Sequence, residues 1–214
     1  MNALLILLSG ILAVTLVAAL WRLASRRRNF PCPVWLSRMV ELDNPFTRTN
    51  RASFIVETLS LSSGMKVLDA GCGPGRLTIP LARSVGPAGR VVALDIQPGM
   101  LDRARNKTVL AGLANVTFVA AALGEGKLPG NHFDRAVLVT VLGEIPNRGE
   151  ALAELFSTLK PGGILAVVEV IFDPHFQSRK TVTATATTAG FRERAFFGHR
   201  LAYVIHFEKP VKQG

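Results

Sequence analysis

The hydrophobic pattern divides the chain into an apolar amino-terminal run and a longer region of alternating segments. Positions 3–20 have the uncharged sequence ALLILLSGILAVTLVAAL. Eighteen helical residues would extend about 27 Å, which is close to the thickness of the hydrocarbon layer. Trp21 follows as an interfacial aromatic, and a basic cluster at Arg22 and 26–28 ends the run. The pattern therefore predicts one transmembrane helix with a basic stop in residues 1–28.

The charge around this run also predicts its orientation. A cleaved signal peptide would carry positive charge before the apolar run and a small-residue cleavage site after it. Here the charge follows the run, and Trp21 and Arg22 occupy the exit, so the pattern favours a permanent single-pass anchor. Because basic residues stay on the cytoplasmic side, the remainder of the chain is predicted to face the cytoplasm, at the cytoplasmic membrane.

Residues 29–61 form a predicted connecting region. Pro31 and Pro33 prevent a helix from continuing straight out of the membrane. Apolar positions then recur over 34–42 with Arg38 and Glu41 between them, which predicts a short amphipathic helix. It could form an interfacial lid near a substrate entrance, or it could simply pack on the domain edge. A second helix is predicted over 49–59.

The third predicted unit, residues 62–214, alternates short β-branched runs with helical stretches. Nearly all-apolar strands separated by helices predict a parallel sheet covered on both faces. Two further runs near the carboxyl terminus predict an antiparallel hairpin joined at Gly198 and His199. The predicted strands are 66–70, 91–96, 116–120, 135–141, 164–171, 191–196 and 201–208, and the helices 77–84, 99–111 and 149–159. The expected fold is α/β: a Rossmann-like, seven-stranded, mostly parallel sheet with a carboxyl-terminal antiparallel hairpin, preceded by one transmembrane helix.

Charge and cysteine content narrow the possible functions. The formal net charge of +10 would suit either nucleic acid or an anionic membrane. Its concentration directly after the apolar run favours the membrane and argues against nucleic acid as a partner. The two cysteines, Cys32 and Cys72, do not form the paired pattern of a disulfide scaffold or a zinc site, so no metal is predicted. Cys72 stands where a small packing residue is expected.

A glycine-rich loop follows the first predicted strand and opens the first helix. Residues 69–75 have the sequence DAGCGPG, whose glycines allow a sharp turn and close approach to a ligand. Asp95 ends the second predicted strand, 20 residues after Gly75. A carboxylate at that place can accept both hydroxyls of a ribose. Loop and acid together predict a site for a nucleoside cofactor.

The loop spacing bears on which cofactor binds. A dinucleotide pyrophosphate usually requires Gly-x-Gly-x-x-Gly, and here Gly75 comes one residue early. A short-chain dehydrogenase would also need a Tyr-x-x-x-Lys pair, but Tyr203 is the only tyrosine and position 207 is Phe. Hydride transfer is therefore disfavoured.

Four motifs resemble those of the class I S-adenosyl-L-methionine (SAM)-dependent methyltransferase family. The first-strand segment VLDAGCGPG at 67–75 is similar to its first motif, and VALDIQPGM at 92–100 to its second-strand motif. FDRAV at 133–137 and LKPGG at 159–163 resemble the fourth-strand motif and the turn before the fifth strand. The resemblance spans roughly 50–210 and is nearest to bacterial quinone and phospholipid methyltransferases.

The resemblance implies SAM as the cofactor and a role for each matching position. Residues at the first loop would hold the methionine part, Asp95 the ribose, and residues after it the adenine. Family members often carry an acid after the third strand, but here that place falls at Ala122. Backbone near 121–123 or Glu125 could replace it, or the chain could bind SAM without turnover. The predicted cofactor residues are Asp69, Gly71, Cys72, Gly73, Gly75, Asp95, Ile96, Gln97, Ala122, Leu123 and Thr140.

Candidate acceptor-side residues follow the fourth and fifth strands, where acceptors bind in such a fold. Methyl transfer needs alignment and exclusion of water, and a phenol or carbon acceptor also benefits from a general base. Glu144 is the first candidate base or cation holder, although it could instead cap a turn. Glu169 and His175 are further catalytic candidates, and either could be structural. His199 and His206 are expected to be structural hairpin residues.

The predicted function is membrane-anchored SAM-dependent methyl transfer to a small, lipid-soluble acceptor. Short connections leave no inserted substrate domain, and a tethered enzyme can meet an acceptor that diffuses within the bilayer. A phospholipid amine or a quinone-like ring would fit. A SAM-binding pseudoenzyme or regulatory membrane protein is the main alternative, and a membrane-tethered nucleic-acid binder a weaker one. The sequence does not fix the oligomeric state.

Overall fold

The computed structural model describes residues 47–211, together with Cys32 and isolated positions at 5, 8–10, 12, 13, 16 and 23. Among the residues so described, no helix combines the length and apolar character needed to span a bilayer. The predicted span at 3–20 is described only at isolated positions, and the predicted helix at 34–42 lies outside the described residues.

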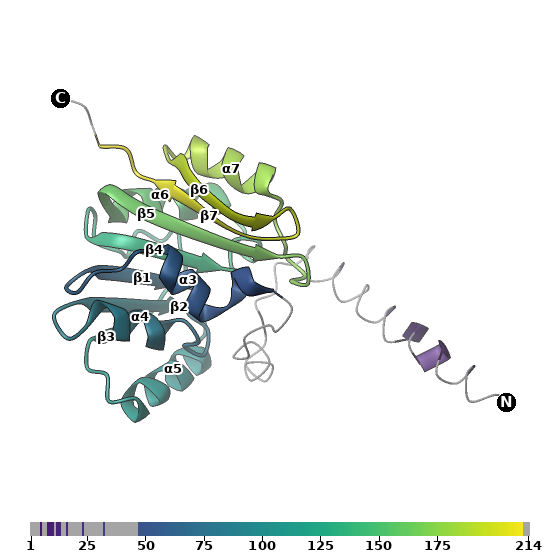
Figure 1. The fold of residues 1–214 in the computed structure, drawn as a ribbon, viewed down its shortest axis with the longest axis horizontal. Helices are drawn as coiled ribbons and strands as arrows, with labels where there is room; N and C mark the ends of the chain where they lie inside the picture. The colour runs from purple at the N-terminus through teal and green to yellow at the C-terminus, as the bar shows by residue number, and fades with distance from the viewer. Residues whose placement is uncertain are drawn as a thin grey trace.

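One seven-stranded sheet organises the described part of the chain, in the order β3-β2-β1-β4-β5-β7-β6 (Figure 1). The first five strands run parallel, and β7 lies antiparallel between β5 and β6. This confirms the predicted mostly parallel sheet with its antiparallel hairpin. The strands are β1 Lys66–Ala70, β2 Arg90–Asp95, β3 Val116–Ala120, β4 Phe133–Val139, β5 Leu159–Val170, β6 Arg192–His199 and β7 Ala202–Glu208.

Helices cover both faces of this sheet, as the apolar strands require. Neighbouring residues of one strand pack on opposite faces of the sheet. Val67 packs with α3 and α4, whereas Leu68 packs with α6 and α7. This alternation follows from the two-residue period of a strand. The helices are η2 Arg48–Asn50, α3 Ala52–Thr58, α4 Thr78–Val85, α5 Pro98–Leu110, α6 Arg148–Thr158 and α7 Arg179–Thr188.

Several predicted boundaries were wrong, and each has a local cause. β4 ends at Val139 rather than at position 141, because Thr140 turns to a φ of +55° and leaves the strand. β5 begins at Leu159, since the segment predicted to be a turn pairs Leu159 with Phe133 across a register shift. The hairpin turns at Arg200 and Leu201 instead of at Gly198 and His199, which are paired within β6.

The predicted helix at 49–59 is interrupted, because Arg51 adopts an extended conformation with ψ of 137°. The 3₁₀ turn η2 therefore precedes the separate helix α3. The threonine-rich segment, for which no helix was predicted, forms α7 behind an N-cap at Ser178, whose hydroxyl accepts from the N–H of Thr181. Val182 and Ala186 of α7 are buried at helical spacing, so packing outweighs the weak helix propensity of threonine.

Candidate active site

The glycine loop leaves the carboxyl end of β1 and is fastened to β2. The main-chain N–H groups of Gly71 and Cys72 donate to the Leu94 carbonyl at 2.7 and 2.9 Å. Gly75 has φ of +86°, and a Cβ there would lie 3.0 Å from Cβ of Ala104 on α5. At Gly73, with φ of +52°, an added Cβ would meet nothing within 4 Å. The loop is therefore packed from behind at Gly75 and open at Gly73, where a ligand can approach the backbone.

Two of the predicted cofactor residues, Asp69 and Cys72, are buried inside the domain. Asp69 is buried, and the Thr78 hydroxyl donates to its carboxylate at 2.6 Å. Burial raises the pKa of Asp69 to about 6, against the opposing effects of Thr78 and Arg76. Cys72 is also buried, and desolvation raises the pKa of its thiol. Asp69 thus links β1 to α4, and Cys72 occupies the packing position expected for it.

Asp95 connects the glycine loop to the end of β2. One carboxylate oxygen accepts from the Gly73 N–H and the other from the Gln97 N–H, both at 2.9 Å. Burial raises the pKa of Asp95, while these backbone donors lower it. The Ile96 N–H also interacts with this carboxylate and lowers its pKa. A carboxylate has about four lone-pair positions, so three backbone donors leave capacity for a ribose hydroxyl.

The two residues after Asp95 have different surroundings: Ile96 is exposed, and Gln97 is hydrogen-bonded to Cys32. Ile96 is 52% exposed, which is high for a large aliphatic side chain beside a glycine loop. The Gln97 side-chain amide donates to the Cys32 carbonyl at 3.0 Å. The Cys32 N–H in turn donates to the Glu144 carboxyl. Cys32 therefore lies between the predicted cofactor and acceptor sides, a contact that no sequence pattern indicated.

The loop after β3 is supported from behind by α6. Ala122 and Leu123 are half-buried, and the Glu154 carboxylate accepts from the N–H groups of Gly124 and Leu128. Glu154 is itself buried and both of its carboxylate oxygens bind this loop, so its role is to shape the loop. Glu125, the alternative acid for the adenine, is exposed and pairs with Lys127 at 3.1 Å.

The fourth strand ends in an unusual conformation at Thr140. Its φ of +55° is uncommon for a residue with a Cβ, and its N–H donates to Val168 at 2.9 Å. Such conformations persist where the surroundings enforce them, and they cluster at functional sites. Thr140 redirects the chain toward the loop that carries Glu144.

Three carboxyl groups gather beyond the ends of β4 and β5. Burial, followed by the charges of Asp173 and Asp95, raises the pKa of Glu144 to about 8. Burial also raises the pKa of Glu169 to about 8, and the charges of Asp173 and Glu144 add to the effect. The three acids therefore lie within electrostatic reach of one another, and Glu144 within reach of Asp95.

Glu169 is only 1% exposed and is asymmetrically bound. One of its oxygens accepts from the Gln177 N–H at 2.9 Å, whereas Oε1 has no hydrogen-bond partner among the described residues. The Tyr203 hydroxyl donates nearby, to the Gln177 carbonyl at 2.8 Å. A buried carboxyl with an unused oxygen is most stable in its protonated form.

His175 lies in the same loop but packs inward. It is 4% exposed, and its N–H donates to the Asp173 carboxylate at 2.7 Å. The main-chain carbonyl of His175 accepts a hydrogen bond from the Gln177 side-chain amide. The same carbonyl packs against Gly143, and a Cβ added at Gly143 would collide with it. Arg148, which the sequence did not single out, holds the facing loop by donating to the carbonyls of Leu142 and Gly143.

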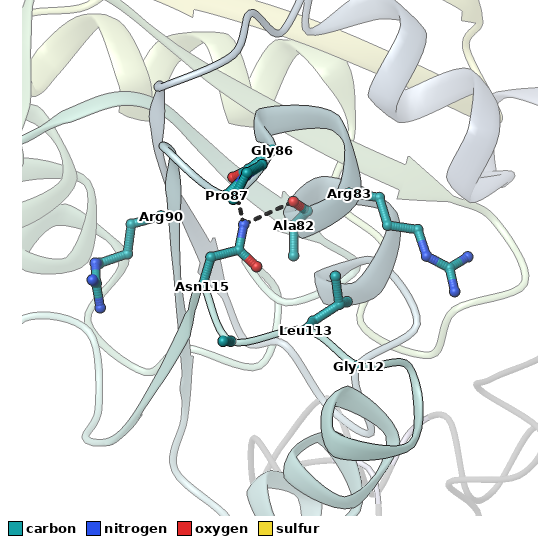
Figure 2. Close-up of a pocket in the computed structure, with 9 residues that line it drawn as sticks. Ala82, Arg83, Gly86, Pro87, Arg90, Gly112, Leu113 and Asn115 are labelled. Carbon is teal, nitrogen blue, oxygen red and sulfur yellow. Dashed lines mark hydrogen bonds between the residues drawn. The ribbon is translucent and has the colours of Figure 1, made fainter.

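A surface hollow of about 460 Å³ lies beside the amino-terminal ends of β2 and β3, and Figure 2 shows the residues that line it. Arg90 at the start of β2 lines it, together with Arg83 and Asn115. Asn115 donates to the carbonyls of Ala82 and Gly86, which joins α4 to the turn before β3. The hollow is thus separate from the carboxyl ends of the strands, where the glycine loop and the acids meet.

Comparison with known proteins bears directly on this arrangement. The methyltransferase domain family matches residues 61–201. The chain belongs to this family. Membership confirms the predicted enzyme class and cofactor: the chain is a SAM-dependent methyltransferase of class I type.

Individual relatives agree with this methyltransferase class. The ubiquinone/menaquinone biosynthesis C-methyltransferase UbiE of Pseudomonas paraeruginosa is 39% identical over 117 residues, covering 54% of this chain and 46% of that relative. The chain thus spans about half the length of the curated relatives it matches.

Solved structures share the fold of this methyltransferase. A SAM dependent methyltransferase from Aquifex aeolicus aligns with a TM-score of 0.73 and 23% identity, over 83% of this chain and 98% of that one. The [4+2]-cyclase SpnF aligns with a TM-score of 0.67 and 20% identity, over 75% and 80% of the two chains. One fold thus carries different reactions, and the acceptor must be argued from the site.

Proposed function

We propose that this methyltransferase transfers the methyl group of SAM to a quinone-like, lipid-soluble acceptor, with Glu144 as general base. The observation that carries the proposal is the Glu144 carboxyl, which has a pKa of about 8 and lies within electrostatic reach of Asp95. A base is most effective when its pKa is close to the working pH. An ordinary exposed glutamate would be a much weaker base for a phenolic proton.

The residues near the glycine loop fit the proposed cofactor. Gly73 leaves open space beside the backbone, and the Asp95 carboxylate retains acceptor capacity beside its backbone donors. Exposed Ile96 offers an apolar face to the adenine, and Gln97, Ala122 and Leu123 would border it. Bound SAM supplies a methyl group activated by its sulfonium. Asp95, Asp173 and the ionised form of Glu144 would place negative potential near that positive charge, whereas protonated Glu169 would add none.

The chain's own residues would prepare the acceptor. Glu144, ionised, would accept a proton from the ring hydroxyl and so increase the electron density of the ring. Glu169, protonated and buried, would donate a hydrogen bond from its unused oxygen to an acceptor carbonyl or hydroxyl. Thr140 and Arg148 would hold the intervening loop in place.

The choice of acceptor rests on two further observations. The UbiE relatives act, by their names, in ubiquinone and menaquinone biosynthesis as C-methyltransferases, and such products dissolve in membranes. The uncharged run at 3–20 with its basic stop supports a single-pass anchor at residues 1–28, with residues 62–214 as the catalytic unit and 29–61 between them. We propose the cytoplasmic face of the cytoplasmic membrane as its location.

A second candidate is a SAM-binding protein without turnover. It is favoured by Ala122, which supplies no side-chain acceptor for the adenine amino group, and by the Cys32 carbonyl, which already engages Gln97. A phospholipid amine is the alternative acceptor for an active enzyme, because an amine needs only to lose a proton.

Labelled-methyl transfer to extracted membrane lipids separates these functions. With the full chain, we expect label in a quinol fraction, and we expect Glu144→Gln to lower kcat at least tenfold while SAM affinity is retained. The rate of the unaltered chain should rise as the pH approaches about 8, because only the ionised Glu144 carboxyl acts as a base, and should fall above that pH, because Glu169 then loses the proton that it donates. Glu150→Gln, at an exposed position of α6, is the matched control. Label in phospholipid alone would contradict the quinone assignment, and SAM binding without any labelled product would favour the second candidate.

A further inference from the structure

We propose that the rim of the sheet around the active site is a docking face for an anionic lipid bilayer. This inference rests on the proposed function, in which the acceptor comes from the membrane. It goes further by identifying the part of the folded domain that touches the lipid, independently of the amino-terminal anchor.

Two exposed apolar side chains project from this rim. Phe172 follows the carboxyl end of β5 and is 71% exposed, and Leu201 in the β6–β7 turn is 41% exposed. The Ile171 N–H donates to the Leu201 carbonyl at 2.7 Å, so the two segments lie side by side. In Figure 1 the β6–β7 turn and the end of β5 emerge at the same end of the sheet. Exposed aromatic and aliphatic side chains at one rim suit insertion into a bilayer interface.

Segments next to this apolar pair carry exposed basic side chains. Arg200 adjoins Leu201 in the turn, and Lys180 lies at the start of α7, just after the loop that carries Phe172; both are exposed. Arg48 and Arg51 are exposed at either end of η2, and Thr49 between them packs on Gly198 of β6. Exposed apolar side chains with cations on neighbouring segments complement an anionic lipid surface.

The candidate active site lies at the same rim. Parallel strands bring Asp95, Thr140 and Glu169 to their carboxyl ends, and Ala202 begins β7 opposite Val170 at the end of β5. Asp173, one of the gathered acids, is next to Phe172 in sequence. A bilayer in contact with Phe172 would therefore lie against the entrance to the acids, and a lipid-soluble acceptor could enter without crossing water.

Cys32 supplies an independent distance limit. Its main chain contacts Gln97 and Glu144 at the mouth of the site. Trp21, the predicted interfacial aromatic, is eleven residues earlier, and a fully extended chain of that length spans at most about 40 Å. If the anchor crosses the membrane, the site mouth must therefore lie within that distance of the interface.

Quenching of tryptophan by brominated lipid tests the docking face. The full chain carries two tryptophans, Trp21 and Trp35, which are replaced by Phe to give a silent background. Phe172→Trp is then compared with Leu110→Trp, because Leu110 is 87% exposed at the end of α5, at the opposite edge of the sheet. Each protein is reconstituted in phosphatidylethanolamine–phosphatidylglycerol vesicles with brominated acyl chains.

We expect fluorescence at position 172 to be quenched at least threefold more than at position 110. Adding Arg48→Glu and Arg200→Glu should reduce the quenching at position 172 at least twofold. Equal quenching at the two positions would overturn the proposal. A change in the fluorescence at position 172 that depends on protein concentration and not on the brominated lipid would also overturn it, because it would indicate that a second copy of the chain covers this face. SAM titration confirms that each variant is folded. Quenching does not require turnover, so the two proposals can fail separately. Methyl transfer without quenching at position 172 would refute only the docking face. Quenching at position 172 without methyl transfer would refute only the proposed function.

Discussion

The main-chain N–H of Gly73 donates to a carboxylate oxygen of Asp95 at 2.9 Å, and this bond joins the glycine loop to the second strand. The other oxygen holds the N–H of Gln97 at the same distance. Asp95 therefore shapes the glycine loop, and in the proposed function the same carboxylate accepts a ribose hydroxyl. Removing it should affect both the stability of the loop and the affinity for SAM.

We predict that Asp95→Ala weakens SAM binding about 10- to 100-fold or more, since hydrogen bonds to a charged group contribute about 1.5–3 kcal/mol. Calorimetric titration with SAM and S-adenosylhomocysteine gives the measurement. Asp102→Ala removes an exposed carboxylate that pairs with Arg105 along α5, and it should bind SAM normally. Retention of tight binding by Asp95→Ala would disprove the cofactor placement.

The loop and Asp95 could be predicted from the sequence because both are local signals. Each lies at the end of an apolar strand, and parallel strands bring their carboxyl ends together. The same reasoning placed Glu144 and Glu169 at one edge, where the structure finds them electrostatically coupled.

Long-range contacts were not predictable in this way. Glu154 supports the loop after β3 from α6, and Cys32 reaches Gln97 across 65 positions of sequence. Neither residue belongs to a periodic pattern or a motif, so only the folded chain shows its partner. Strand boundaries also differed from the prediction where strand pairing outweighed local turn signals. The first residue of β5 pairs with β4 although its sequence is typical of a turn.

A second prediction concerns the packing of the glycine loop against α5. Gly75 and Gly64 share a φ of +86°, but a Cβ at Gly75 would lie 3.0 Å from Ala104, whereas at Gly64 it would meet nothing within 4 Å. Gly64→Ala should therefore incur only backbone strain, about 1–2 kcal/mol. Gly75→Ala should add the cost of overpacking, about 1–3 kcal/mol more.

Thermal unfolding of the two variants isolates that difference. A destabilisation of 1 kcal/mol lowers Tm by about 2–4 °C in a chain of this size, so Gly75→Ala should melt several degrees below Gly64→Ala. Its SAM affinity should also fall, because the strained loop holds the cofactor. Equal Tm values for the two variants would show that α5 can shift to accommodate the added Cβ, and that its packing does not hold the glycine loop in place.

The last prediction follows from the buried carboxyl of Glu169. Its pKa in the folded chain is about 8, above the ordinary value of 4.5, because burial penalises the ionised form. The unfolded chain loses this proton at lower pH than the folded chain does. The stabilising contribution is therefore complete below about pH 4.5 and is lost as the pH rises through about 8.

Glu169→Gln should consequently reduce the fall in Tm between pH 6.5 and 8.5, since an amide cannot ionise. His206, with a pKa lowered to about 4 by burial, contributes its own pH dependence below about 6.5 and leaves this window undisturbed. Glu144 titrates in the same range, so part of the slope should remain in the variant. Glu57→Gln, at an exposed position of α3, should retain the full slope. If Glu169→Gln and Glu57→Gln melt with the same pH dependence, the Glu169 carboxyl is already ionised at neutral pH and cannot act as the proposed hydrogen-bond donor.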